Sequence, residues 1–164
     1  PAHIEYLGAL SNEQVIDHLK RSHVGLLPTY DDSYGYSLLE SQAAGCPVIS
    51  TRIRALPEIN YDSVGWLINV PTNSLGYANY IDASARQELS DQIRDGLYNT
   101  MKSIIDNPQV IREKGINSLQ RIRRQHDPIE RAEKLEQLYS KIRRRTRTPM
   151  MKSTVEQDEQ SMVH

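Results

Sequence analysis

GLLPTYDDSYGYSLLESQAAGCPVISTRI, residues 25–53, is the stretch that decides the fold. An apolar run ends at Pro28, and a polar loop with two aspartates follows it. A short helix is predicted over residues 36–44, closed by Gly45, and a second apolar run begins at residues 47–49. Two strands joined through a helix pair in parallel, and ligands bind such sheets at the carboxyl ends of the strands. The two aspartates are therefore expected at a ligand crevice.

The sequence upstream and downstream extends this pattern. Residues 3–7 (HIEYL) have the composition of a strand, and residues 64–68 (VGWLI) form the last predicted strand. Ser11 and Gln14 have the spacing of a capping box, which predicts a helix over residues 12–21. Strands that alternate with helices over short connections predict an α/β fold, with a Rossmann-like parallel sheet flanked by helices.

The rest of the chain combines loops with C-terminal helices. Pro57 and Glu58 are predicted to lie in a loop, and residues 71–84 form a second loop that is rich in Asn, Ser and Tyr. Asn107-Pro108 and Asp127-Pro128 each place a cap residue before a proline, which predicts a helix start at both positions. A further helix is expected before Asn107. The apolar residues expected to face a core on these three helices are Leu89, Ile93, Leu97, Met101, Ile104, Ile105, Val110, Ile111, Leu119, Ile122, Ala132, Leu135, Leu138 and Ile142.

The predicted helices end near Ile142. We therefore expect residues 1–142 to form one domain and residues 143–164, basic and then polar, to form a disordered tail. The basic run either ends a helix as a solvated cap, which the helix dipole favours, or contacts anionic lipid at a membrane surface. Its cations are Arg143, Arg144, Arg145 and Arg147.

Composition narrows the class of protein. The chain has 164 residues, a net charge of −1 and 25% charged residues, which is typical of a soluble domain without a general attraction for nucleic acid. No apolar stretch is as long as the roughly 20 residues of a membrane span, and the first residues (PAHIEY) do not look like a signal peptide. A cytoplasmic location is the expectation. Cys46 is expected to be a small buried side chain, and the five histidines have no metal-ligand spacing.

Three residues of the crevice could carry chemistry. Gly35 precedes a predicted helix, and its missing side chain lets a ligand approach the free N–H groups of the first turn. Glu40, one turn later, could accept hydrogen bonds from a sugar diol, and Asp32 could hold another hydroxyl. The structural alternatives are a solvated helix face for Glu40 and helix capping for Asp32. The spacing leaves both possibilities open.

YDDSYGYSLLESQAAGCPVIST, residues 30–51, resembles the signature of glycosyltransferases of the GT-B fold that use nucleotide sugars, specifically the retaining, family 4-like group. The residues that match are Asp32 (where the family usually has Glu), Tyr34, Gly35, Leu39, Glu40, Ala43, Ala44, Gly45, Pro47 and Val48. The resemblance implies that the chain is part of the C-terminal, donor-binding domain, one half of a GT-B fold. The N-terminal acceptor domain would then be missing, and the isolated 164 residues are expected to be inactive.

The resemblance also implies a role for each site residue. Glu40 would hold the ribose, and the backbone at Gly35, Tyr36 and Ser37 would contact the diphosphate and sugar. Asp32, the expected catalytic residue, would take the place of the acidic side chain that touches the donor sugar. Tyr34 belongs to the same substrate-binding motif. The donor would be a nucleoside diphosphate sugar, and neither a metal nor a cofactor is expected. Nucleic acid is not an expected partner.

Two departures from the family pattern leave alternatives open. Asp32 is one methylene shorter than the usual Glu, and Arg54-Ala55 stands where relatives often have two glycines. Arg54 is either a cation near the phosphates or a surface residue. A non-catalytic partner or regulatory module that kept the fold, and a sugar-nucleotide epimerase, are the rival functions.

Overall fold

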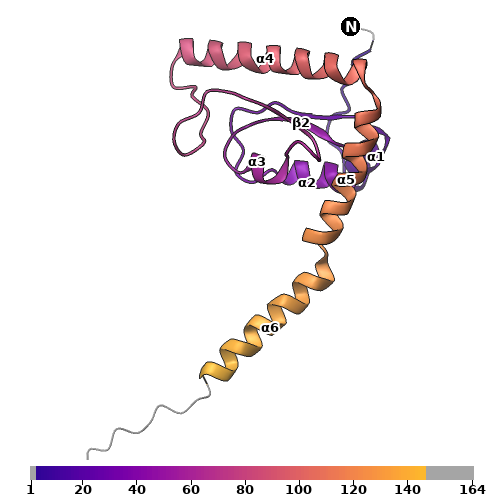
Figure 1. Cartoon of the computed structure of the whole chain (residues 1–164), viewed down its shortest axis with the longest axis vertical. Coiled ribbons are helices and arrows are strands. Elements are labelled where there is room, and N and C mark those ends of the chain that lie inside the picture. The colour runs from indigo at the N-terminus through magenta and orange to yellow at the C-terminus, as the bar shows by residue number, and fades with distance from the viewer. Residues whose placement is uncertain (1–2, 147–164) are drawn as a thin grey trace, which may run out of the picture. The chain divides into compact units, whose positions relative to one another are not determined.

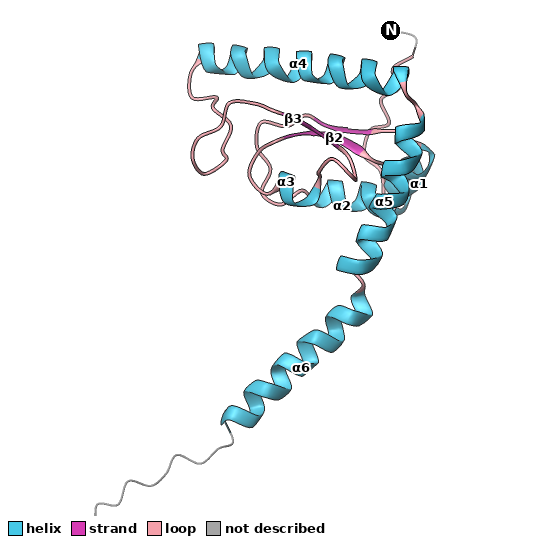
Figure 2. Cartoon of the chain, in the orientation of Figure 1, coloured by secondary structure: helices cyan, strands magenta, loops and turns pink. Residues whose placement is uncertain are grey.

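Three short parallel strands form a sheet in the order β1-β2-β3 (Figure 2). The strands are β1 (Gly25–Leu27), β2 (Val48–Thr51) and β3 (Trp66–Ile68). The structure, a computed structural model, describes residues 3–146. In the sheet, Leu26 pairs with Ile49, and Ile49 pairs with Trp66. The central strand β2 is buried along its whole length. The predicted α/β fold with a parallel sheet is confirmed.

Helices cover both faces of this sheet. The helices of the described residues, 3–146, are α1 (Asn12–Arg21), α2 (Tyr36–Ala43), α3 (Leu56–Ile59), α4 (Ala83–Asp106), α5 (Gln109–Gln125) and, outside the unit that holds the sheet, α6 (Pro128–Thr146). Figure 1 shows α4 along one face of the sheet and α2 with α3 along the other. Side chains alternate along a strand, so neighbours in β2 reach different clusters. Val48 packs in a cluster with Leu38 of α2, and Ile49 in a second cluster with Ile68 and Ile104.

The chain divides into two compact units after His126. The sheet and α1 to α5 belong to the first unit, and α6 belongs to the second. The first unit contains the buried core and all the loops that follow the strands.

Local capping signals set two of the helix starts. The Ser11 hydroxyl accepts a hydrogen bond from the Gln14 amide, and the Gln14 side chain accepts one from the Ser11 amide at 2.9 Å, so the predicted capping box is confirmed. The Asp127 carboxylate accepts from the Ile129 amide at 2.8 Å, and α6 begins at Pro128 as predicted. The predicted start at Asn107 is different, because Asn107 ends α4 and α5 has no side-chain cap.

Two predicted elements are wrong. Residues 3–7 do not form a strand, and the side chains of Ile4 and Tyr6 are exposed. A strand needs a neighbour for its backbone hydrogen bonds, and composition alone does not supply one. Pro57 and Glu58 lie in the short helix α3 instead of a loop, since proline is compatible with the first turn of a helix.

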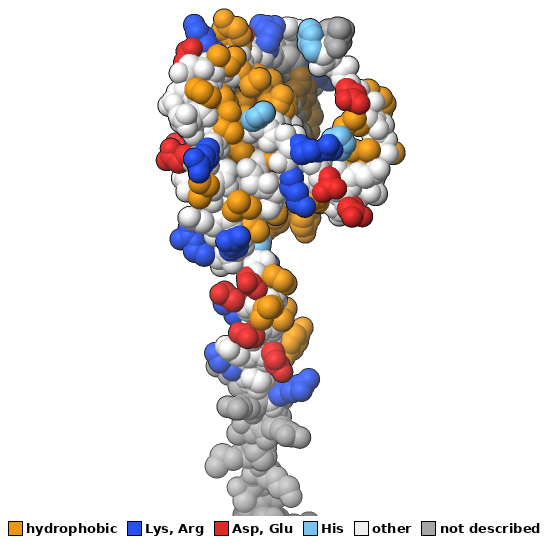
Figure 3. All heavy atoms as spheres, turned by 90° about the vertical axis from the view of Figure 1, so that its right-hand side faces the viewer, with side chains coloured by type: hydrophobic (Ala, Val, Ile, Leu, Met, Phe, Trp, Pro, Cys, Tyr) orange, Lys and Arg blue, Asp and Glu red, His pale blue; other side chains and the backbone are white. Residues whose placement is uncertain are grey.

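The predicted apolar helix faces are only partly buried. On α4, Leu89 and Ile93 are buried, whereas Met101 and Ile105 are exposed. On α6 the exposed hydrophobic residues include Leu135, Leu138 and Ile142, and Figure 3 shows hydrophobic side chains beside charged ones on this helix.

Helix α6 continues to Thr146, so residues 143–146 are helical although the sequence assigned them to the tail. Residues 147–164, including Arg147, lie outside the described part of the chain. Among the helices described, none is long and apolar enough to cross a membrane.

Candidate functional site

Three loops meet at the carboxyl edge of the sheet, one after each strand. The carbonyl of Thr29, after β1, accepts a hydrogen bond from the Thr51 hydroxyl at 2.7 Å. Asp31 of the same loop pairs with Arg54 after β2, with 2.8 Å between the carboxylate oxygen and the guanidinium nitrogen. The amide of Arg54 donates to the carbonyl of Gly76, in the loop after β3, at 2.8 Å. The edge predicted from the sequence is thus a connected set of loops.

Asp32 holds the turn that leads into α2. Its Oδ1 atom accepts hydrogen bonds from the Tyr34 amide at 2.9 Å and from the Gly35 amide at 2.6 Å. These bonds close the turn that precedes α2. Asp32 is not the cap of this helix, because the N-cap residue is Gly35 and no described side chain caps α2. The residues described supply no hydrogen bond to its other carboxylate oxygen, which leaves that atom available to a ligand.

Gly35 makes this turn possible. Its φ of +78° is in the left-handed region, and a Cβ atom at this position would lie 2.7 Å from Leu56 Cδ2. Any other residue would meet both a backbone penalty and a clash. The next two amides, of Tyr36 and Ser37, belong to the first turn of α2, where N–H groups have no partner within the helix. They are the donors that an anion could bind.

Glu40 lies one turn further along α2 and is half-buried. It lines a cavity of about 180 Å³ between α2 and β1, together with Ser37 and Leu26. The next residue, Ser41, is buried and donates from its hydroxyl to the Ser37 carbonyl at 2.8 Å, which satisfies its buried polar group. The structure therefore places Glu40 on a cavity wall instead of on a fully solvated helix face.

The structure brings the predicted residues together in two groups. Asp32 and Gly35 share a hydrogen bond, and Ser37 and Glu40 share a cavity that Asp32 does not line. The rings of Tyr34 and Tyr36 contact each other, with 5.1 Å between their centroids, and both are exposed.

The Arg54 side chain has two specific contacts in the structure, which the sequence did not predict. Its guanidinium group lies 4.7 Å from the centroid of the Tyr77 ring and pairs with Asp31, and only 28% of the side chain is exposed. The hydrogen bond to Asp31 raises the pKa of Arg54 further above its usual value. Its φ is +45°, an unusual backbone conformation for a residue with a side chain.

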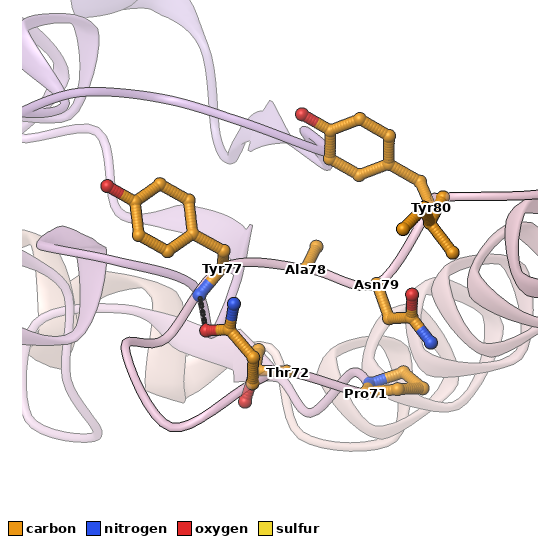
Figure 4. A pocket seen from close by; sticks show the side chains of 8 residues that line it. Pro71, Thr72, Tyr77, Ala78, Asn79 and Tyr80 are labelled. Atoms are coloured by element: carbon orange, nitrogen blue, oxygen red, sulfur yellow. Dashed lines mark hydrogen bonds between the residues drawn. The ribbon is translucent and has the colours of Figure 1, made fainter.

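The loop after β3 lines a larger cavity of about 520 Å³ that is open to solvent (Figure 4). Residues 71–73 and 77–81 line it. The sequence predicted this segment as a surface loop, which is correct, but gave no indication of the cavity. Tyr80 of this loop contacts the ring of Tyr30 at a centroid distance of 6.3 Å, so the loop also touches the segment after β1.

Metal and thiol chemistry have little support in the residues described. None of the described His, Cys, Asp and Glu side chains form a group of three that could hold a metal ion. Cys46 is buried, and burial raises the pKa of its thiol, which disfavours the nucleophilic thiolate. This agrees with the expected packing role.

The chain is similar in sequence to known sugar-transferring proteins. The family model described as "Glycosyl transferases group 1" matches residues 1–100. The gpi3 subunit of phosphatidylinositol N-acetylglucosaminyltransferase from Schizosaccharomyces pombe is 28% identical over 100 residues, which are 61% of this chain and 20% of that protein. The matched segment includes the strands, α2 and all three loops of the site.

Two bacterial relatives match at similar identity. D-inositol 3-phosphate glycosyltransferase from Saccharomonospora viridis is 30% identical over 89 residues, covering 54% of this chain and 20% of that protein. N-acetyl-alpha-D-glucosaminyl L-malate synthase from Bacillus anthracis is 31% identical over 111 residues, covering 62% of this chain and 28% of that protein. The matches thus cover between 20% and 28% of the length of each of these relatives.

Proposed function

The chain belongs to the glycosyl transferases group 1 family, and from that premise we propose that it is the donor-binding part of a longer enzyme. In this proposal the enzyme transfers a hexose-type sugar from a nucleoside diphosphate sugar to an acceptor, with retention of configuration. The two-domain architecture is GT-B, and this chain is most of its C-terminal domain.

The position of Glu40 is the observation that carries the proposal. A half-buried carboxylate on a cavity wall can accept two hydrogen bonds from a vicinal diol such as that of ribose. One turn earlier, the amides of Tyr36 and Ser37 are the free donors at the positive end of α2. A carboxylate that accepts hydrogen bonds from a diol, beside amides that donate hydrogen bonds to phosphate, is the arrangement that a nucleoside diphosphate requires.

Asp32 is proposed to act on the donor sugar while it keeps the turn. Its Oδ1 atom bonds to the Tyr34 and Gly35 amides, so its second oxygen is the one offered to a sugar hydroxyl. No metal or cofactor is part of the proposal, because helix N–H groups and protein cations can stabilise a leaving diphosphate. Tyr34 is proposed to line the sugar side of this turn.

The acceptor domain is proposed to lie outside this chain. Within the described residues β1 pairs with β2 alone, so its other edge is available for further strands. The exposed hydrophobic residues of α6, among them Leu135 and Leu138, are available for contact with another domain. Both features suit a chain that works as part of a larger protein.

We also propose a cytoplasmic location with contact to an anionic membrane surface. The basic run begins at Arg143 on α6 and continues through residues 144–147. Cations of this kind attract anionic lipid in a salt-dependent way. Co-sedimentation with phosphatidylserine vesicles should occur at low salt and be lost at high salt; absence of binding at low salt would exclude this contact.

Calorimetry with a panel of nucleoside diphosphates tests the donor assignment in the full-length protein. One of the nucleotides should bind, and Glu40→Ala should weaken its binding about tenfold or more through loss of charge-assisted hydrogen bonds. Glu88→Ala, on the exposed surface of α4, is the matched control and should leave binding unchanged. Absence of nucleotide binding, or normal turnover in Glu40→Ala, would refute the proposal.

A non-catalytic module is the second candidate, and one observation favours it. The charged groups at the carboxyl edge are already partly satisfied within the protein: one oxygen of Asp32 binds two amides, and Asp31 pairs with Arg54. A site built for binding alone needs no further free charge there. A full-length protein that binds the nucleotide but neither transfers nor hydrolyses the donor sugar would support this candidate over the enzyme.

A further inference from the structure

The cavity in the loop between β3 and α4 has no role in the donor proposal. It lies apart from the cavity at Glu40 and shares none of its lining residues. Its volume of about 520 Å³ falls within the roughly 300–1,000 Å³ that small-molecule sites usually have. The question is what kind of ligand its chemistry would accept.

The cavity is lined without any charged side chain. Its polar groups are one threonine, two asparagines and two tyrosines, and its apolar groups include Ala78 and Ile81. Figure 4 shows the rings of Tyr77 and Tyr80 on the same side of the chain, with Ala78 between them. Neutral hydrogen-bonding groups beside aromatic faces suit an uncharged ligand that has hydroxyl groups around an apolar ring face. None of these lining residues is a cation that could pair with a phosphate group.

The loop is held in place before any ligand arrives. Thr72 and Ala78 form an antiparallel bridge, and the Asn73 side chain accepts hydrogen bonds from the amides of Leu75 and Tyr77. Such ordering lowers the entropy that binding would cost.

Two contacts tie the same loop to the carboxyl edge of the sheet. Arg54 lies over the ring of Tyr77 and pairs with Asp31, which neutralises its charge locally. Tyr80 contacts Tyr30, whose hydroxyl hydrogen-bonds with Ser90 of α4. The cavity is therefore beside the loop of Asp31 and Asp32, where a transferred sugar would be handled.

The Asn79 side chain is available to a ligand. It is exposed, and the residues described supply no hydrogen bond to its amide group. The backbone amide of Asn79 donates a hydrogen bond to the Pro71 carbonyl at 3.0 Å. Substitution of this side chain can therefore remove a ligand contact and leave the loop in place.

We propose that the loop of residues 71–81 is a carbohydrate subsite that binds an uncharged pyranose unit. The pyranose ring packs on Tyr77 or Tyr80, and its hydroxyls bond to Asn79 and the tyrosine hydroxyls. The unit is either the sugar of the donor or a sugar of the acceptor, and the chemistry of recognition is the same for both. This inference rests on the proposed sugar-transfer function for the source of its ligand, but it does not depend on the assignment of Glu40 to the nucleotide.

Saturation-transfer NMR on the full-length protein with a panel of neutral methyl pyranosides tests the subsite. Tyr80→Ala should weaken the binding of the best pyranoside about three- to tenfold, as loss of one aromatic face does. Asn79→Ala should weaken it as well, and this variant keeps the backbone bonds of the loop. Tyr98→Ala removes an exposed tyrosine from α4 and should have no effect. Circular dichroism verifies that each variant is folded.

Lack of saturation transfer to every pyranoside, or equal binding by Tyr80→Ala, Asn79→Ala and the unchanged chain, would overturn the subsite. Two further arms with the full-length protein identify the source of the sugar. A pyranoside that still binds when nucleoside diphosphate saturates the protein indicates an acceptor sugar. A nucleotide sugar that displaces the pyranoside, where the free nucleotide does not, indicates the donor sugar. Failure of nucleotide binding alone would count against Glu40 and leave this result intact.

Discussion

Asp32 combines a structural contact with a proposed catalytic one, and substitution can separate them. Asp32→Asn keeps an oxygen that can accept from the Tyr34 and Gly35 amides, but removes the charge. We expect its free energy of unfolding to fall by no more than about 1 kcal/mol, the usual contribution of a charge at a helix N-terminus. Turnover of the full-length enzyme should fall at least tenfold. Urea unfolding and donor-sugar transfer measure the two effects.

Asp32→Ala is the companion variant, since it removes the turn bonds and the charge together. It should lose stability as well as turnover. Normal turnover in Asp32→Asn would mean that Asp32 serves only to hold the turn before α2, and the carboxylate would then have no part in the reaction.

Gly35 is the position in the site where one added methyl group should matter most. Gly35→Ala places a Cβ atom 2.7 Å from Leu56 Cδ2 and forces a side chain into a left-handed backbone. We expect a loss of about 2–4 kcal/mol in the free energy of unfolding, from backbone strain plus overpacking. Urea unfolding at constant pH measures it.

Gly8→Ala is the matched control for Gly35. Gly8 also has a positive φ, +67°, but a Cβ atom there would meet nothing within 4 Å. Its cost should therefore be the backbone term alone, about 1–2 kcal/mol at most. Equal losses in the two variants would show that contact with Leu56 is unimportant.

At the scale of elements, α5 packs unusually close to the end of α2. A Cβ atom at Gly115 of α5 would lie 2.6 Å from the carbonyl oxygen of Gly45, just after α2. Alanine favours a helix over glycine by about 1 kcal/mol, whereas overpacking costs about 1–3 kcal/mol. The oxygen belongs to the backbone before Pro47 and cannot easily move, so the overpacking should prevail.

We therefore expect Gly115→Ala to lower the free energy of unfolding by about 1–2 kcal/mol. Gln120→Ala, at an exposed position of the same helix, should change it by less than about 0.5 kcal/mol. Parallel denaturant titrations of both variants make the comparison. A stabilised Gly115→Ala would indicate that helix propensity dominates and that the two helices can separate slightly.

The elements that the sequence predicted well are those with local signals. The capping box at Ser11 set the start of α1, and Gly45 marked the end of α2. Residues 3–7 had strand composition but no partner, and pairing is not a local property. Pro57 is a common loop signal, but proline also suits the first turn of a helix, and it lies there in α3.

At the scale of the whole molecule, the site combines local and distant contacts. The turn at Asp32 and the helix that carries Glu40 are local, so their sequence spacing was informative. The pair of Asp31 and Arg54 joins residues 23 apart in the chain, and Tyr77 comes from a third loop. Such contacts depend on how the strands are ordered, so a single sequence could not reveal the cavity beside them.

The stability of the whole molecule should depend on the titration of Lys114. This residue of α5 is buried, hydrogen-bonds to the Asp62 carbonyl and lies 5.1 Å from the centroid of the Trp66 ring. Burial lowers the pKa of Lys114 below its ordinary value of 10.5, although the Asp62 and Glu113 carboxylates act in the opposite direction. In the folded state the lysine therefore binds its proton less tightly than in the unfolded state.

A lowered lysine pKa means that the folded state bears an electrostatic cost at neutral pH. As pH rises from the folded pKa toward 10.5, the unfolded state binds more protons than the folded state, and stability rises. Lys114→Met lacks this titration and keeps a side chain of similar shape. As pH rises from 7 to about 10, the unfolding free energy of the unchanged chain should therefore increase relative to that of Lys114→Met. The gain should be about 1.4 kcal/mol for each unit by which the folded state lowers the pKa of Lys114. Urea unfolding of both proteins across this range measures the shift, and a constant difference would mean that water or the Asp62 carbonyl fully compensates the buried charge.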